Sequence, residues 1–177
     1  MRIRNYRQGD IPTLTHIQQL AAQSDGVEAM GETDFEQWFA QLELNPQSNV
    51  FVITDDDELN EWGQGGTLDG LEGEAVGYTV LQLRKSHHAY HFLCEGAVLP
   101  QHRRRDAGES LLICALNHAR MRASEFEFEA AQEGYPIYFE ALLPVSDPGS
   151  ERLAMKCGLK TTNEATLKGM RLYRYQL

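Results

Sequence analysis

YHFLCEGAVLPQHRRRDAGESLL (residues 90–112) is the stretch that decides the fold. Its first part, residues 90–99, is rich in aromatic and aliphatic side chains, which predicts a central β-strand that Pro100 ends. Residues 101–108 form a basic turn, and from Glu109 to Arg120 apolar residues recur at helical spacing. A strand, a turn and a helix in this order predict one parallel crossover, which residues 137–143 (IYFEALL) would complete.

The segments on either side of this unit predict further strands and helices. Strand composition recurs in residues 2–6 (RIRNY), 49–54 (NVFVIT), 75–83 (AVGYTVLQL) and 170–175 (MRLYRY), and we expect 49–54 and 75–83 to pair antiparallel. The order of the segments predicts an α/β fold. Its central sheet would be mixed, mostly antiparallel and of about six or seven strands, with helices on both faces.

Short signals mark where the helices begin and end. Asp10 is predicted to cap a first helix that has Pro12 in its first turn, and Asp147-Pro148 is predicted to begin a late one that Gly158 ends. A second helix is expected from about Thr33, ending at Asn45-Pro46. Residues 121–134 fit either a helix extension or an acidic loop. The apolar face of the second helix would carry Phe35, Trp38, Phe39 and Leu42.

Composition and charge limit the classes of function that the chain can have. The chain has 177 residues, 42% hydrophobic and 24% charged, which predicts one globular domain spanning residues 1–177. Its formal charge of −10 argues against a nucleic-acid or membrane-surface role. Eight of the acidic residues, and no Lys or Arg, lie between Asp55 and Glu74, so the rest of the chain is nearly neutral. We expect residues 55–74, which are also rich in glycine, to form a mobile loop.

The cysteines and the N-terminal residues bear on the compartment. Cys94, Cys114 and Cys157 are odd in number and lack metal-ligand spacing, which favours reduced thiols and predicts no metal site. The first residues, MRIRNYRQGD, lack the apolar stretch of a secretory signal. The sequence also has no run of 18 apolar residues, so it predicts no membrane span. We therefore expect a cytoplasmic protein.

The basic turn is a candidate anion site. Backbone N–H groups at a helix N-terminus, together with Arg103, Arg104 and Arg105, suit a pyrophosphate or ribose phosphate. A charge run alone is more typical of a solvated surface. Nucleic-acid binding through these arginines is the third reading, and it predicts a steep salt dependence.

A second segment gives the basic turn a specific meaning. Residues 98–112 resemble the acyl-CoA-binding signature V-x-P-x-x-R-x-x-G-x-G/A-x-x-L-L of the GNAT superfamily of N-acetyltransferases, and residues 147–159 (DPGSERLAMKCGL) look like its C-terminal element N-P-x-S-x-R-L-A-x-K-x-G-F. The opening RIRNYRQGD also resembles the usual first strand and helix of the superfamily. The signature matches at Val98, Pro100, Arg103, Gly108, Leu111 and Leu112.

The resemblance implies direct transfer of an acetyl group from acetyl-CoA to an amine through a tetrahedral intermediate in a ternary complex, without a metal. The acceptor would be a small-molecule or protein amine, and the acidic surface would favour a cationic one. The oligomeric state stays open, a homodimer included. The implied cofactor contacts are the strand residues Ala97, Val98 and Leu99, the loop and helix residues Arg103, Arg104, Arg105, Asp106, Ala107, Gly108, Glu109 and Ser110, and, in the C-terminal element, Asp147 and Ser150.

The candidate general base is Glu95, because it precedes the cofactor-binding strand residues and burial there would raise its pKa toward neutrality. A solvent-facing glutamate is the alternative reading, and Glu140 is the second candidate base. Cys94 is expected to be a buried structural thiol.

Three positions depart from the superfamily pattern. Asp106 replaces the first loop glycine, Asp147 replaces an asparagine, and Ala154 replaces a tyrosine that often protonates the thiolate. Asp106 would either weaken cofactor binding by its charge or cap the helix. These departures keep open an alternative function, an acyl-CoA-binding sensor with little or no turnover. Substitute tyrosines, more typical of strand packing, are Tyr135, Tyr138, Tyr173 and Tyr175.

Overall fold

The computed structural model describes residues 1–40, 45–55, 73–164, 166 and 168–177. Within these residues one seven-stranded sheet has the order β1-β2-β3-β4-β5-β7-β6. Its single parallel pair is β4–β5, as the crossover predicts, and the other neighbouring pairs are antiparallel. The strands are β1 (Arg2–Asn5), β2 (Val50–Asp55), β3 (Glu74–Lys85), β4 (Tyr90–Val98), β5 (Ile137–Pro144), β6 (Lys160–Thr161) and β7 (Met170–Gln176).

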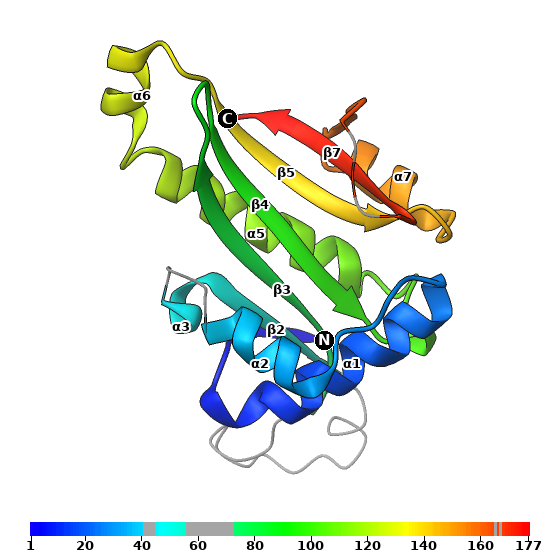
Figure 1. The fold of residues 1–177 in the computed structure, drawn as a ribbon. Coiled ribbons are helices and arrows are strands. Elements are labelled where there is room, and N and C mark those ends of the chain that lie inside the picture. The colour runs from blue at the N-terminus through cyan, green and yellow to red at the C-terminus, as the bar shows by residue number, and fades with distance from the viewer. Residues whose placement is uncertain (41–44, 56–72, 165, 167) are drawn as a thin grey trace.

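Helices lie on both faces of the sheet, which confirms the predicted fold class. Figure 1 shows α1 and α2 on one face, over β2 and β3, and α5 crossing the other face. The helices are α1 (Ile11–Asp25), α2 (Glu32–Ala40), α3 (Pro46–Asn49), α5 (Ala107–Ala123), α6 (Glu127–Glu133) and α7 (Gly149–Lys156), with 3-10 turns η1 (Gln8–Asp10) and η2 (Pro100–His102).

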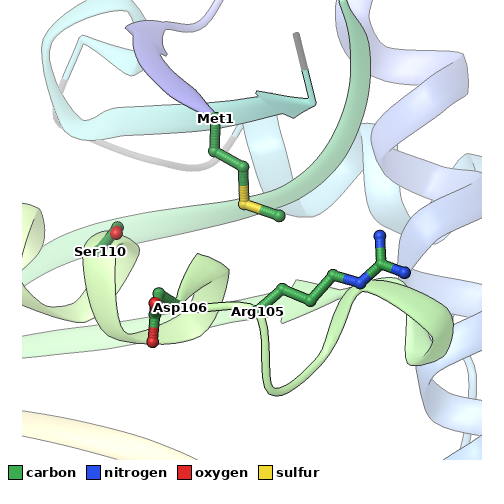
Figure 2. Close-up of a pocket in the computed structure, with 4 residues that line it drawn as sticks. All are labelled: Met1, Arg105, Asp106 and Ser110. Carbon is green, nitrogen blue, oxygen red and sulfur yellow. The ribbon is translucent and has the colours of Figure 1, made fainter. Parts of the chain in front are cut away.

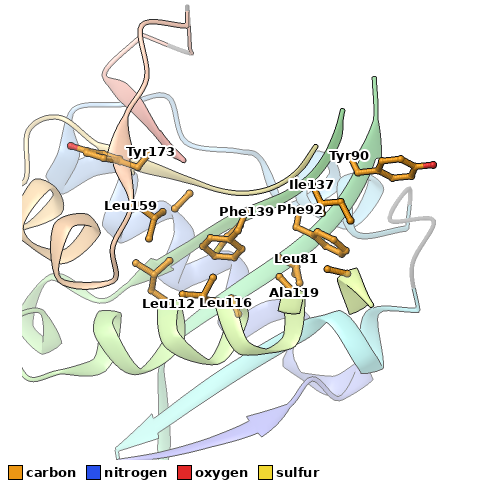
Figure 3. Packing of buried hydrophobic residues seen from close by; sticks show 14 of the residues in the cluster. Leu81, Tyr90, Phe92, Leu112, Leu116, Ala119, Ile137, Phe139, Leu159 and Tyr173 are labelled. Atoms are coloured by element: carbon orange, nitrogen blue, oxygen red, sulfur yellow. The ribbon is translucent and has the colours of Figure 1, made fainter. Parts of the chain in front are cut away.

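The alternation of side chains along β3 and β4 assigns residues to the two faces. Leu81 and Phe92 pack with Phe139 and the α5 residue Leu116 in a buried hydrophobic cluster (Figure 3). Tyr78 has the opposite parity in β3, and its ring meets Phe35 of α2 edge-on at 5.8 Å. Successive side chains of a strand point to opposite faces. The even-numbered residues of β3 and the β4 residues that pair with them therefore lie on the same face as Tyr78. This is the face that α1 and α2 partly cover.

Two local expectations are corrected, and one that the sequence left open is settled. The Asp10 side chain does not cap α1; it binds the Arg4 guanidinium at 2.7 and 2.8 Å and accepts the Arg7 N–H. Asn45-Pro46 begins the short helix α3, with the Asn45 side chain accepting the Gln47 N–H. Residues 121–134 complete α5 and form the separate helix α6.

Two predictions concern residues outside the described part of the chain. These are the place of Leu42 on the second helix and the loop over residues 56–72, which hold most of the acidic stretch. In the described part of the chain, no helix has both the length and the apolar character to cross a membrane.

Candidate active site

The central opening of the sheet lies where β4 and β5 part. Their parallel pairing runs only as far as Cys94 and Ala141. Beyond this point β4 stays paired with β3 as far as Val98, and β5 stays paired with β7 as far as Pro144. The two inner edges therefore offer backbone N–H and C=O groups that an extended ligand can bind in the manner of an added strand.

Glu95 is the first residue beyond the last β4–β5 pair. It pairs with Val80 in β3, so its side chain lies on the same sheet face as Tyr78. Within the described part of the chain its carboxylate receives no hydrogen bond. Burial raises the pKa of Glu95, and the positive charge of Arg84 offsets part of that increase. A half-buried, unbonded carboxylate at the opening is suited to accept a proton. The role of Glu95 as general base stays a prediction.

Gly96 lets β3 and β4 approach closely at the same point. A Cβ on Gly96 would lie 2.2 Å from the carbonyl oxygen of Tyr78 and 2.9 Å from the Cα of Thr79. Gly96 is nevertheless exposed to solvent. Gly96 thus lines the opening, and only glycine fits at this position without moving the strand backbone.

Glu140, the second candidate base, sits in a network of charged groups. Only 6% of the residue is exposed, and its Oε1 accepts a hydrogen bond from Arg174 Nε at 2.7 Å and lies 3.0 Å from His91 Nδ1. Arg174 also binds Glu164 at 2.6 Å and stacks over the Tyr138 ring at 4.7 Å. Because its oxygen is already engaged, Glu140 is less available for proton transfer than Glu95.

The turn before α5 has an unusual backbone. Arg104 and Asp106 both adopt a left-handed conformation, each with φ of 62°. Asp106 thus has the conformation that glycine adopts freely, at the position where the superfamily signature has glycine, and a non-glycine residue there costs about 1–2 kcal/mol. Asp106 occupies the N-cap position of α5, as the alternative predicts, but its side chain makes no capping hydrogen bond. The first backbone N–H groups of α5 are therefore left for an anion.

A shallow cavity of about 520 Å³ lies at this helix end. Figure 2 shows Arg105, Asp106 and Ser110 around it, with the Met1 side chain on the opposite side. Arg104 and Arg105 are exposed. These two side chains can reach a phosphate group, and Asp106 is the negative charge that such a group would meet.

Arg103 has a different role from its two neighbours. Its guanidinium donates to the Asp25 carboxylate at 2.6 and 2.8 Å, and its Nε donates to the Val98 carbonyl at 3.3 Å. The hydrogen bond to Asp25 is the main cause that raises the pKa of Arg103. Arg103 thus fixes the loop to the end of α1, and its contact with a phosphate stays a prediction.

The two sequence motifs lie side by side in the fold. Lys156 of α7 forms an ion pair with Glu109 of α5, and the Arg103 guanidinium lies 3.8 Å from the Asp147 carboxylate. Asp147 accepts the Gly149 N–H at 2.8 Å, while Ser150 is buried. α7 starts at Gly149, one residue later than predicted. Cofactor contacts by Asp147 and Ser150 stay predictions.

Ala154, at the position of the missing tyrosine, is fully buried, and none of the tyrosines that the structure describes is classed as exposed. Tyr138 lies under Arg174, Tyr173 is buried, and Tyr175 contributes its ring to a cation–π contact with Arg120. These are packing roles, as their strand positions predict.

Sequence reasoning missed Tyr78, the tyrosine on the same face as Glu95. It is 3% exposed, and its pKa is raised first by burial and then by the charge of Glu95. The alternating pattern of residues 75–83 would have identified its face, had the register with β4 been known. Asp25 and Arg84 were also missed.

Cys94 is buried, as expected, and faces the α5 side of the sheet. Burial raises its pKa to about 12, and its Sγ lies 3.1 Å from the Thr79 hydroxyl. A thiolate nucleophile is therefore disfavoured at this position. The described residues also contain no group of three or more His, Cys, Asp or Glu side chains that could hold a metal ion.

The fold is similar to that of solved acetyltransferases. A GCN5-related N-acetyltransferase from Sphaerobacter thermophilus matches 90% of this chain with a TM-score of 0.66 and 17% identity. This chain spans only 43% of that protein. The Salmonella typhimurium protein yncA, solved with its cofactor acetyl-CoA, has a TM-score of 0.62 and 16% identity over 99% of this chain and 93% of its own.

A ribosomal-protein-alanine N-acetyltransferase from Brucella melitensis has a TM-score of 0.63 and 15% identity over the full length of both chains. No protein-family model matches the sequence, and no curated protein matches it either. The chain therefore has the GNAT fold, which confirms the fold that the two motifs imply.

The left-handed turn yields a paired prediction. Asp106→Gly should raise the free energy of unfolding by about 1 kcal/mol and tighten acetyl-CoA binding, because it removes both backbone strain and a carboxylate beside the phosphates. Arg104→Gly should relieve similar strain but weaken acetyl-CoA binding, because it removes a positive charge. Chemical denaturation and calorimetric titration of both variants check this. Unchanged or weaker acetyl-CoA binding by Asp106→Gly would show that this carboxylate does not oppose the cofactor.

Proposed function

We propose that this chain is an N-acetyltransferase that moves the acetyl group of acetyl-CoA directly to a primary amine. The observation that carries the proposal is Glu95, a half-buried carboxylate with a raised pKa that lies where β4 and β5 part. A proton acceptor and an extended binding edge at one opening are what amine acylation by a thioester requires.

The residues present suit acetyl-CoA. The uncapped N-terminal amides of α5, with Arg104 and Arg105, would hold the phosphates. The inner edge of β4 would hold the pantetheine arm, although the Val98 carbonyl and the Leu99 N–H already bond to Arg103 and Val76. Gly96, which lies on this strand, is exposed to solvent.

The chemistry divides between the ligand and the protein. Acetyl-CoA supplies an acetyl group activated as a thioester. Glu95 would remove a proton from the acceptor ammonium. The amine nitrogen then forms the bond to the acetyl carbon as the carbon–sulfur bond breaks, and a proton returns to the thiolate. The products are the N-acetyl amine and CoA.

The second candidate is an acyl-CoA sensor without turnover. The buried Ala154 and the carboxylate of Asp106 at the phosphate site favour it. The two candidates differ in CoA release: an enzyme releases CoA faster when a suitable amine is added, and a sensor does not. A thiol-detection assay with an amine panel, run beside calorimetric acetyl-CoA binding, separates them. Tight binding without any amine-stimulated release would contradict the enzyme proposal.

The pH dependence of the reaction gives a further prediction. Glu95 accepts a proton only as a carboxylate, and its folded-state pKa is raised. We therefore expect kcat/KM to fall as the pH drops through that raised pKa, so that the acidic limb lies above the range of an ordinary glutamate. A pH–rate profile measures this, and a limb at the ordinary glutamate value would contradict a buried base.

A further inference from the structure

Arg84 places a positive charge on the same face of the sheet as Glu95. In the β3–β4 register Val80 pairs with Glu95, Gln82 with Leu93 and Arg84 with His91. The side chains of these pairs lie on one face of the sheet, because every second residue of a strand points to the same face. Arg84 is exposed and is the second-last residue of β3 (Glu74–Lys85). Figure 1 shows that the end of β3 that joins β4 lies away from α1 and α2.

Arg84 differs from Arg174, the other arginine that faces this part of the sheet. Arg174 binds both Glu140 and Glu164. The guanidinium of Arg84, by contrast, donates only to the neutral side-chain oxygen of Gln82, at 2.7 Å, and meets no carboxylate within the described part of the chain. An arginine fork without an acidic partner retains N–H groups that match the geometry of a carboxylate.

The spacing between Arg84 and Glu95 suits a small molecule. Residues 80 and 84 are about 13 Å apart along β3, and Val80 is opposite Glu95. The Arg84 side chain leans back toward Gln82, which shortens the gap to Glu95. Leu93, paired with Gln82, lies between the two charges and gives the gap an apolar floor. The two charges are coupled, since Arg84 lowers the pKa of Glu95 against the effect of burial.

We propose that the acceptor is a small amine that also carries a carboxylate, an amino acid in the broad sense, with its carboxylate on Arg84 and its amine at Glu95. The inference rests on the proposed function and adds a substrate class to it without a new chemical step. A polyamine or a protein N-terminus would leave Arg84 without an anion. The local charge thus points to a different acceptor from the cationic one that the acidic composition favours.

The test compares each amino acid with the amine that lacks its carboxylate. Leucine with isopentylamine and phenylalanine with phenethylamine form two such pairs, and a short peptide with a free N-terminus is the third kind of acceptor. The wild-type enzyme should have a KM for the amino acids about 10- to 100-fold below that for the matched amines. This ratio corresponds to the usual free-energy contribution of a charged hydrogen-bonded pair.

Arg84→Gln should remove this preference by raising the KM for the amino acids, with little change for the matched amines. Arg84→Lys should restore part of it. Arg171→Gln is the control, because Arg171 is exposed and pairs with Leu143, on the α5 side of the sheet. Equal use of both members of each pair, preference for the peptide, or an Arg84→Gln variant that keeps the preference would overturn the proposal.

A binding measurement separates this inference from the proposed function. Leucine and isopentylamine are titrated calorimetrically into the CoA-bound protein and its Arg84→Gln variant. If no amine is acetylated, the transfer proposal fails; leucine binding that Arg84→Gln abolishes still supports carboxylate recognition. Absence of leucine binding to the wild-type protein would overturn that recognition.

Discussion

Glu95→Gln is expected to lower kcat/KM for amine acetylation by about 10²- to 10⁴-fold, the range that a positioned general base contributes. Glutamine keeps the size of the side chain but cannot accept the proton of the ammonium. Acetyl-CoA affinity should stay close to that of the wild type, because the phosphates would be held at α5, away from Glu95. Steady-state kinetics with saturating acetyl-CoA and a calorimetric titration measure the two quantities.

The same substitution should leave the protein as stable or make it more stable near neutral pH. Burial raises the folded-state pKa of Glu95, so the folded protein binds the proton more tightly than the unfolded chain. Stability therefore falls as the pH rises from the ordinary glutamate pKa through the raised one, and a neutral glutamine removes that loss. Glu129→Gln on the exposed side of α6 is the matched control. Near-normal activity in Glu95→Gln would mean that another group takes the proton.

Gly96→Ala is expected to destabilise the protein by about 1–3 kcal/mol, the usual cost of forcing an extra carbon into a packed site. The new Cβ would lie 2.2 Å from the Tyr78 carbonyl oxygen, so the backbone of β3 or β4 must move. The displacement falls where the two inner strand edges part, so the variant should also bind acetyl-CoA more weakly.

The control for this substitution is Gly9→Ala. A Cβ on Gly9 meets nothing within 4 Å, and its backbone does not need a positive φ. That variant should keep the wild-type free energy of unfolding or gain up to about 1 kcal/mol from lost chain entropy. Chemical denaturation of both variants measures the difference. Equal stability of Gly96→Ala and Gly9→Ala would contradict the close approach of β3 and β4.

The crossover from β4 through α5 to β5 was predictable from the sequence, because apolar residues with a period near 3.6 between two β-branched and aromatic runs allow few other structures. The same pattern placed Glu95 just before residues 97–99, for which the superfamily resemblance predicts cofactor contacts. It could not show that Glu95 lies just beyond the last β4–β5 pair, since that depends on where two strands distant in sequence stop pairing.

The partners of the arginines were not predictable. Asp25 binds Arg103 across 78 residues of sequence, and only the packing of α1 against the loop before α5 brings them together. The position of Arg84 relative to Glu95 depends on the turn that Ser86 and Ala89 close, which sets the β3–β4 register. Asn45-Pro46 fits both the end and the beginning of a helix, and the structure uses it as a beginning.

The most direct test of the central claim follows the acetyl group itself. Acetyl-CoA labelled with ¹³C in its acetyl carbonyl is incubated with the protein and an amino acid, and the products are identified by mass spectrometry. The account predicts labelled N-acetyl amino acid in step with CoA release by the wild-type protein, and almost none with Glu95→Gln. Binding of acetyl-CoA with no labelled N-acetyl product from any amine, or release of the label only as free acetate, would contradict it.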